Sequence, residues 1–284
     1  MTGDDERLQF QAMVSFRRSD DLESRVEDWF RLCREHLSGP VFAGLGEPRH
    51  GGSNWGVDFD GELDLGSITF PPRMSLQYWS VVPDPIPPGP FESPRPLGEV
   101  DVSVWMDKFP FGKFICEASS DNLSAADVAV HLRELVAEHV SRFRVGYGAV
   151  TSAVNGVGRP PLEPALRRSY VDGFYQSEQV LRGYAWVTVV PVGLEPLIEE
   201  RAKAFPMLQT RRADSGVLLV EAGPRPEDYD EAMMQALWEC LAPALPSGVP
   251  RRMKVGPPQG LVFRDAREVA PFHLRAEPGP GDGR

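Results

Sequence analysis

The pattern of hydrophobic and polar positions around which the chain is organised lies in residues 181–223. From Tyr184 to Val190 both sets of alternate positions are largely apolar, a pattern typical of a strand buried on both faces. Apolar residues then recur at helical spacing over Leu194–Phe205. A polar strand at Met207–Arg211 and an apolar strand at Val217–Glu221 follow, so the segment predicts a β-α-β-β unit.

The first half of the chain shows a similar succession of patterns. Alternation over Leu8–Phe16 predicts a strand that is covered mainly on one side, and helical spacing follows over Leu22–Leu37. Two alternating segments, Val100–Met106 and Lys113–Glu117, predict a hairpin. The next helix is expected over Ser124–Arg142, because Ser-Ala-Ala-Asp at its start resembles a capping box.

Glycine and proline interrupt the segment between these patterns. We expect short strands around Trp55–Phe59 and Leu76–Val82, then a proline-rich connection over residues 83–98. A further strand is expected over Phe143–Ala149 and a short helix over Leu162–Ser169.

Together these elements predict an α+β protein with two similar halves, each a mainly antiparallel sheet with helices on one face, and a duplicated ferredoxin-like unit is the candidate arrangement. The halves are expected at residues 1–154 and 155–274, and residues 275–284 form a tail expected to be disordered. The second half is expected to end with a helix over Tyr229–Leu245 and an edge strand at Gly260–Arg264.

Composition narrows the classes of function. A formal charge of −11 over 284 residues disfavours nucleic-acid binding, which needs clustered Lys and Arg. The acidic amino terminus is unlike a secretory signal and no stretch is long and apolar enough to span a membrane, so a cytoplasmic protein is predicted. Three widely spaced cysteines, Cys33, Cys116 and Cys240, suit buried reduced thiols.

Motifs with well-defined chemistry do not occur. The chain has no Walker loop, paired CxxC, HExxH helix or GxSxG elbow, so the sequence predicts no cofactor, no metal and no enzymatic activity. His131, Glu134 and Glu138 could share one side of a helix as metal ligands do, but a solvated charged face is the favoured interpretation.

Four alternate carboxylates give the clearest candidate binding site. In an extended segment, Asp58, Asp60, Glu62 and Asp64 would project to one side and form a negative ridge. A solvated face explains this pattern, and binding of a basic protein surface is the functional alternative.

Aromatic residues near irregular loops give a second candidate, a pocket between the two halves. The residues that could line it are Trp55, Tyr78, Trp79, Trp105 and His50. Such a pocket would serve an enzyme or a small-ligand binder.

The run Leu181–Thr188, followed by Gly216–Leu219 and Ala222–Pro226, resembles the type VI immunity family associated with bacterial polymorphic toxins. It is also similar to uncharacterised actinobacterial proteins with an RGYxWVTVVP run. The resemblance covers chiefly residues 181–246. It implies an immunity-like protein that binds and neutralises a cognate, basic toxin. An enzyme or small-ligand binder and a scaffold or regulatory module remain alternatives.

Overall fold

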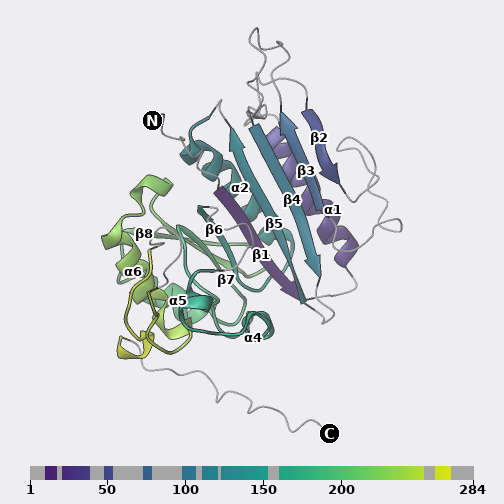
Figure 1. Ribbon diagram of the computed structural model, residues 1–284. Helices are drawn as coiled ribbons and strands as arrows, with labels where there is room; N and C mark the ends of the chain where they lie inside the picture. Colours follow the sequence, from purple (N-terminus) through teal and green to yellow (C-terminus); the bar gives the residue numbers. More distant parts are fainter. Residues whose placement is uncertain are drawn as a thin grey trace, which may run out of the picture.

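The protein is an α+β fold built on one antiparallel sheet of nine strands (Figure 1). The computed structural model describes residues 10–17, 21–38, 48–53, 73–78, 98–106, 111–120, 123–152, 160–252 and 260–269. The strand order is β2-β3-β4-β5-β1-β6-β7-β9-β8, and every neighbouring pair is antiparallel. The two predicted halves therefore share one sheet, joined where β6 pairs with β7.

The strands are β1 Phe10–Arg17, β2 Pro48–Ser53, β3 Arg73–Tyr78, β4 Gly98–Met106, β5 Phe111–Ser120, β6 Gly148–Ser152, β7 Val187–Val190, β8 Leu208–Arg212 and β9 Leu218–Ala222. The α-helices are α1 Leu22–Cys33, α2 Ala125–Arg142, α3 Leu162–Ala165, α4 Tyr170–Tyr175, α5 Glu195–Ala202 and α6 Glu231–Leu241. A π-helical segment, η1, continues α1 over Arg34–Ser38, and 3₁₀ turns occur at η3 Pro226–Asp228, η4 Ala242–Ala244 and η5 Ala266–Glu268.

Both halves follow the same order of elements. The first runs β1-α1, an antiparallel meander β2 to β5, then α2, and its first strand pairs with the last strand of the meander. The second runs β7-α5-β8-β9-α6, with β7 beside β9. Strand β6 lies beside both first strands, so it occupies the place of the closing strand of a β-α-β-β-α-β unit in each half.

Strand β8 has a helix from each half on its two faces: α2 of the first half on one face and α5 of the second half on the other. Successive side chains of a strand point to opposite faces. Arg211 reaches Glu134 of α2, whereas its neighbour Arg212 forms ion pairs with Glu195 and Glu199 of α5. The crossovers explain this arrangement, because β1-α1-β2 and β7-α5-β8 each join parallel strands but run in opposite directions along the sheet. Two right-handed crossovers of this kind must place their helices on opposite faces.

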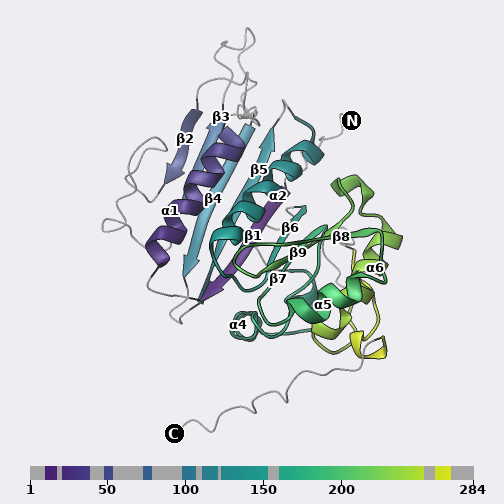
Figure 2. The ribbon, with the colours of Figure 1, turned by 180° about the vertical axis from the view of Figure 1, so that it is seen from behind.

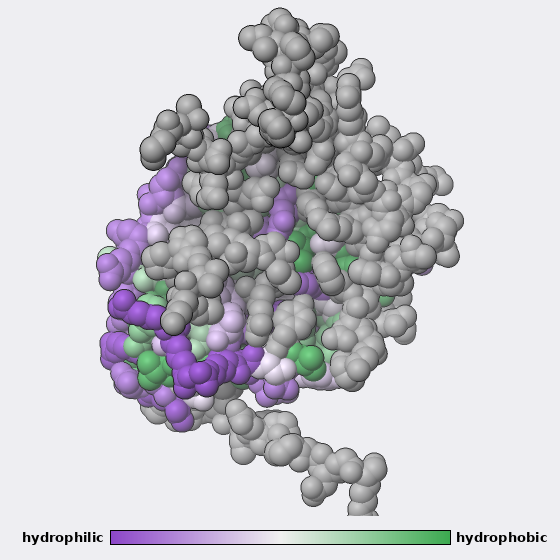
Figure 3. Space-filling view, viewed as in Figure 1, coloured by the Kyte–Doolittle hydropathy of each residue, from purple (hydrophilic) through white to green (hydrophobic). Residues whose placement is uncertain are grey.

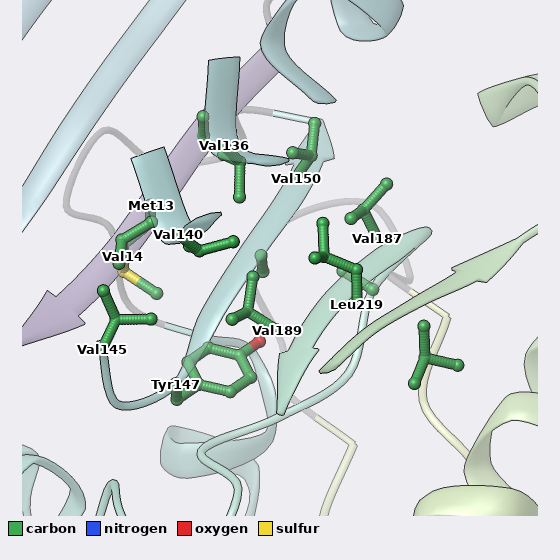
Figure 4. Packing of buried hydrophobic residues seen from close by; sticks show 14 of the residues in the cluster. Met13, Val14, Val136, Val140, Val145, Tyr147, Val150, Val187, Val189 and Leu219 are labelled. Carbon is green, nitrogen blue, oxygen red and sulfur yellow. The ribbon is translucent and has the colours of Figure 1, made fainter. Parts of the chain in front are cut away.

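The core between α2 and the centre of the sheet joins the two halves. Figure 2 shows α1 and α2 in front of the strands of the first half. In Figure 4, Val136 and Val140 of α2 lie close to side chains from β6, β7 and β9; these are Val150, Val187, Val189 and Leu219. All six are buried. One hydrophobic core therefore extends across the predicted boundary between the halves.

Several local predictions are confirmed. Ser124 caps α2 by accepting a hydrogen bond from the backbone N–H of Asp127 at 3.2 Å. The predicted hairpin forms between β4 and β5. Cys33, Cys116 and Cys240 are buried reduced thiols, and burial raises the pKa of Cys240 to about 11.

Other predictions are wrong. Strand β1 is buried on both faces, since Gln11, Met13 and Ser15 are covered as well as the apolar set. Residues Phe143–Tyr147 precede β6 and are not part of it, and β7 begins only at Val187. The segment Gly260–Arg264 is irregular and forms no edge strand. The strand expected at Trp55–Phe59, most of the connection at 83–98, the boundary at 154–155 and the tail at 275–284 lie outside the described residues.

Candidate functional site

A group of buried polar side chains lies on the face of β1 and β5 that points away from α2. The other face is apolar: Phe16 and Phe114 stack at 4.4 Å between ring centroids, and Phe114 contacts Trp29 of α1. On the polar face, Gln11 lies opposite Glu117 and donates a hydrogen bond to its carboxylate. Ser15 lies opposite Lys113, which is only 1% exposed.

The segment between β6 and β7 supplies the rest of this group. Arg182 donates two hydrogen bonds to the carboxylate of Glu163, from Nε at 2.7 Å and from a terminal nitrogen at 3.0 Å. The guanidinium also lies 3.9 Å from the ring centre of Phe174. On the neighbouring helix α4, Tyr175 meets Phe111 of β5 edge-on, with ring centroids 4.9 Å apart. This segment thus packs on the second face of the first half, which is why β1 is buried on both sides.

A glycine makes room for the ion pair. A Cβ at Gly173 would lie 1.9 Å from Oε1 of Glu163, far inside van der Waals contact. Gly183, next to Arg182, likewise lies close to the hydroxyl of Tyr147, at 3.3 Å from the position of a Cβ. A larger residue at Gly173 would displace the Glu163 carboxylate, whereas at Gly183 an added Cβ would first meet Cβ of Pro160, at 2.9 Å.

The electrostatics of the cluster follow from burial. Burial lowers the pKa of the Lys113 amine to about 8, and the nearby positive charge of Arg182 acts in the same direction, while Glu163 and Glu117 oppose it. Burial also raises the pKa of Tyr147, so that hydroxyl stays protonated. We call the set Lys113, Tyr147, Glu163 and Arg182 the interhalf cluster.

The interhalf cluster contains an amine that could take part in chemistry, Lys113, and an ion pair that can hold the structure together, Arg182 with Glu163. About a tenth of an amine with a pKa near 8 is neutral at pH 7, which is the form that acts as a base or nucleophile. The bidentate pair of Arg182 and Glu163 instead holds α3 against the residues just before β7. Perturbed amines are enriched at functional sites, although ion-pair networks perturb them too.

A second buried pair joins α1 to α2. The Nδ1 atom of His139 lies 2.9 Å from Oδ2 of Asp28, and the imidazole is fully buried among aromatic rings. Burial would raise the pKa of Asp28, but hydrogen bonds from His139, Arg31 and Arg142 outweigh it and hold the pKa at about 2. Burial lowers the pKa of His139, so a neutral imidazole donates from Nδ1 to the carboxylate.

This pair resembles the orienting half of a catalytic triad but lies inside the core. Nε2 of His139 has no hydrogen-bond partner among the described residues, and the ring packs edge-on against Trp29 and Phe114. A base must reach the proton that it removes. The full burial of His139 therefore favours a structural role, in which the pair holds α1 against α2.

The helix residues considered as metal ligands have other partners. Glu138 contacts His36 at 3.0 Å and Arg142, and Glu134 pairs with Arg133 and Arg211. Burial lowers the pKa of His131. Over the described residues no group of three His, Cys, Asp or Glu side chains is arranged to hold a metal ion.

The other residues singled out from sequence are placed only in part. Asp58, Asp60, Glu62 and Asp64 lie outside the described residues, as do Trp55 and Trp79. His50 belongs to β2 and Tyr78 to β3, three or more strands from β1 in the sheet order. Trp105 is opposite Lys113 in the register of β4 and β5.

The interhalf cluster was not predicted from the sequence. One signal was present: Lys113 interrupts the apolar strand Phe-Gly-Lys-Phe-Ile-Cys at a position whose neighbours are buried. Its partners, Glu163 and Arg182, come from a segment that the sequence predicted only as a short helix and a strand. No pattern along the chain links them to β5.

The chain is similar in fold to a solved protein, the Pseudomonas aeruginosa T6SS protein PA0821. The TM-score is 0.53 at 12% sequence identity, and the match covers 92% of this chain and 81% of that chain. No protein-family model matches the chain, and no curated protein matches its sequence. The two proteins thus share an overall fold that extends through both halves. Among the described residues, no helix has both the length and the apolarity needed to cross a bilayer.

Proposed function

We propose that this protein is an immunity-like factor that binds a cognate toxin and neutralises it by contact, without catalysis of its own. The observation that carries the proposal is the likeness to a T6SS protein over nearly the whole chain. It agrees with the resemblance of residues 181–246 to the type VI immunity family. The fold alone does not specify an activity, so the partner must be found by experiment.

The side-chain chemistry of the described residues supports binding over catalysis. The buried Asp28–His139 pair and the buried Glu163–Arg182 pair each join separate elements of the fold. They stabilise the arrangement of helices and sheet and leave the surface for contact. An acidic chain with a charge of −11 would associate rapidly with a basic partner.

The direct test is protection. Each gene next to the one that encodes this chain would be expressed in a susceptible bacterium with and without this protein, and growth would be followed together with co-purification of the two products. We expect one neighbouring product to be toxic alone, and to be harmless and bound when this chain is present. If every neighbouring product is harmless, or remains toxic and unbound, the proposal is wrong.

The negative ridge expected from Asp58, Asp60, Glu62 and Asp64 needs a separate test. The variant D58N/D60N/E62Q/D64N removes four charges with little change in size. If the ridge steers the toxin, association should slow by about tenfold or more at low salt, and the salt dependence should weaken. An unchanged association rate would exclude the ridge while leaving the toxin-binding proposal in place.

The buried amine favours a second candidate, a small-ligand binder. The charge of Arg182 acts on Lys113 in the interior, where both residues are buried, so a ligand carboxylate or phosphate could contact them only after this part of the protein opens. Thermal-shift measurements with small anionic metabolites would test this candidate. A ligand of this site should raise the Tm of the wild-type protein but not that of Lys113→Met, and equal shifts in both proteins would exclude the site.

A further inference from the structure

We propose that a patch of arginines beside α3, flanked by exposed apolar side chains, is a docking surface for an acidic segment of a partner protein. The patch consists of Arg167, Val249, Arg251, Arg252 and Phe263, and we call it the arginine patch. This inference does not depend on the toxin-binding proposal, whose charge preference is the opposite.

The backbone brings the arginine patch together from three parts of the second half. The N–H of Arg251 donates to the carbonyl of Ala165 in α3 at 2.9 Å, which places residues 249–252 beside the end of that helix. Arg167 follows Ala165 by two residues. The guanidinium of Arg252 lies 5.4 Å from the ring centre of Phe263. Figure 3 shows hydrophilic and hydrophobic side chains side by side over this half of the molecule.

These arginines differ from most others in the protein. Arg211, Arg212 and Arg225 are exposed, yet each pairs with carboxylates of the same chain. Within the described ranges, neither Arg167 nor Arg251 nor Arg252 forms an ion pair, although the chain carries an excess of acid. Nearby acidic groups are engaged elsewhere: Asp265 pairs with Arg267, and Glu268 with Arg264. The arginine patch is thus a local positive surface on a negative protein.

Arg167 has an unfavourable backbone conformation. Its φ of 58° lies in the left-handed region, and Arg167 is the one described non-glycine residue that adopts it. The N–H of Arg168 returns to the carbonyl of Glu163 at 2.9 Å, as at a helix end where glycine is usual. An arginine at this position costs stability and presents an exposed cation. Such strain often coincides with functional positions.

The apolar members indicate a protein partner. Val249 is 56% exposed and Phe263 41% exposed, and they lie among the arginines. Arginine and aromatic residues are enriched at protein interfaces, where a few of them carry most of the binding energy. A nucleic acid would meet the repulsion of a chain with a net charge of −11. An acidic peptide with interspersed apolar residues complements both the charge and the apolar area.

The test uses the full chain and a short fluorescein-labelled peptide rich in Asp and Glu with interspersed Leu and Phe. Fluorescence anisotropy would give Kd for the wild-type protein, for R251Q/R252Q and for Phe263→Ala. Arg225→Gln is the control, because Arg225 is also exposed but pairs with Asp127. We expect saturable binding that weakens about tenfold or more in R251Q/R252Q and in Phe263→Ala but is unchanged in Arg225→Gln. Circular dichroism and Tm would verify folding of each variant.

Three results would overturn the proposal. Wild-type protein that does not bind the peptide would exclude this partner chemistry. Equal loss in R251Q/R252Q and Arg225→Gln would show general electrostatic attraction and no site. Competition by inorganic phosphate, or tighter binding of a single-stranded DNA oligonucleotide, would assign the arginine patch to phosphate groups. Because this assay uses no toxin, its failure is distinguishable from a failure of protection.

Discussion

Arg182 and Glu163 form a bidentate ion pair inside the protein, although 19 positions separate them along the chain. Their side chains are 0% and 1% exposed. The pair connects the start of α3 to the residues just before β7. It therefore closes the segment between the two halves on itself, and Tyr175 of the same segment contacts Phe111 of β5.

Loss of one member of this pair should be costly, because the other charge remains buried. We expect Glu163→Ala to lower the free energy of unfolding by about 3–5 kcal/mol. The double variant E163L/R182M replaces the pair with apolar side chains of comparable length and should be more stable than Glu163→Ala alone. Urea denaturation of the three proteins would measure this, and a double variant less stable than the single one would contradict the argument.

Replacement of the buried amine should have the opposite effect. Lys113 has a folded-state pKa near 8, below its ordinary value of 10.5, so it destabilises the folded state when charged. We expect Lys113→Met to raise the free energy of unfolding at pH 7 by about 1–3 kcal/mol. A stabilising substitution at this position would agree with a lysine retained for function at the expense of stability.

The same shift determines a pH dependence. For a lysine whose pKa is lower in the folded than in the unfolded state, the folded state is least stable when the amine is protonated. Stability is therefore fully present above the unfolded-state pKa and is lost as the pH falls to the folded-state pKa. The wild-type protein should therefore gain stability, relative to Lys113→Met, as pH rises from about 8 to 10.5. Parallel stability curves for the two proteins over this range would show that Lys113 does not titrate as described.

His139 should produce a separate pH effect on the acidic side. Its imidazole is buried and neutral, with a pKa below the ordinary 6.5, so the unfolded chain takes up a proton that the folded chain does not. We expect the free energy of unfolding to fall by up to about 1.4 kcal/mol per pH unit below pH 6.5 from this group. In His139→Gln this part of the slope should disappear. Because the pKa of Asp28 is about 2 in the wild-type protein, loss of its contribution there falls between about pH 4 and 2, below the range of the His139 effect.

Urea midpoints at pH 7, 6 and 5 would measure the His139 effect. His36→Gln is a suitable control, since His36 is partly exposed and contacts Glu138 at the surface. An equal change of slope in His36→Gln and His139→Gln would not support the assignment to the buried imidazole.

The conformation of Arg167 predicts a stabilising substitution. At a φ of 58°, glycine avoids the steric cost that a Cβ imposes, so Arg167→Gly should raise the free energy of unfolding by about 1 kcal/mol. Arg167→Ala removes the same charge but keeps the Cβ, and it should bring no comparable gain. Thermal unfolding of both variants would separate backbone strain from charge, and an equal gain in both would assign the effect to charge.

Sequence patterns located the elements well where burial follows a regular period. The hairpin of β4 and β5, the capped helix α2, and α5, β8 and β9 of the second half were predicted close to their observed bounds. Irregular segments were predicted poorly. Residues 181–186 are buried without strand pairing, so their alternating apolar pattern extended the predicted β7 too far.

The candidate site could not be derived in the same way. Its members, Lys113, Tyr147, Glu163 and Arg182, come from β5, the approach to β6, α3 and the approach to β7. Each alone fits an ordinary strand, turn or helix. Only the fold of α3 and α4 onto the second face of β1 and β5 makes them a cluster.

The sequence by itself determined most of the strands and helices, the α+β class and the common order of the two halves, because these depend on local propensity and on the period of apolar positions. The tertiary structure alone decided that β6 serves both halves, that α2 and α5 lie on opposite faces, and that a lysine and an arginine meet in the interior. Those features depend on pairing and packing between residues far apart in the chain, and such contacts leave no periodic trace in one sequence.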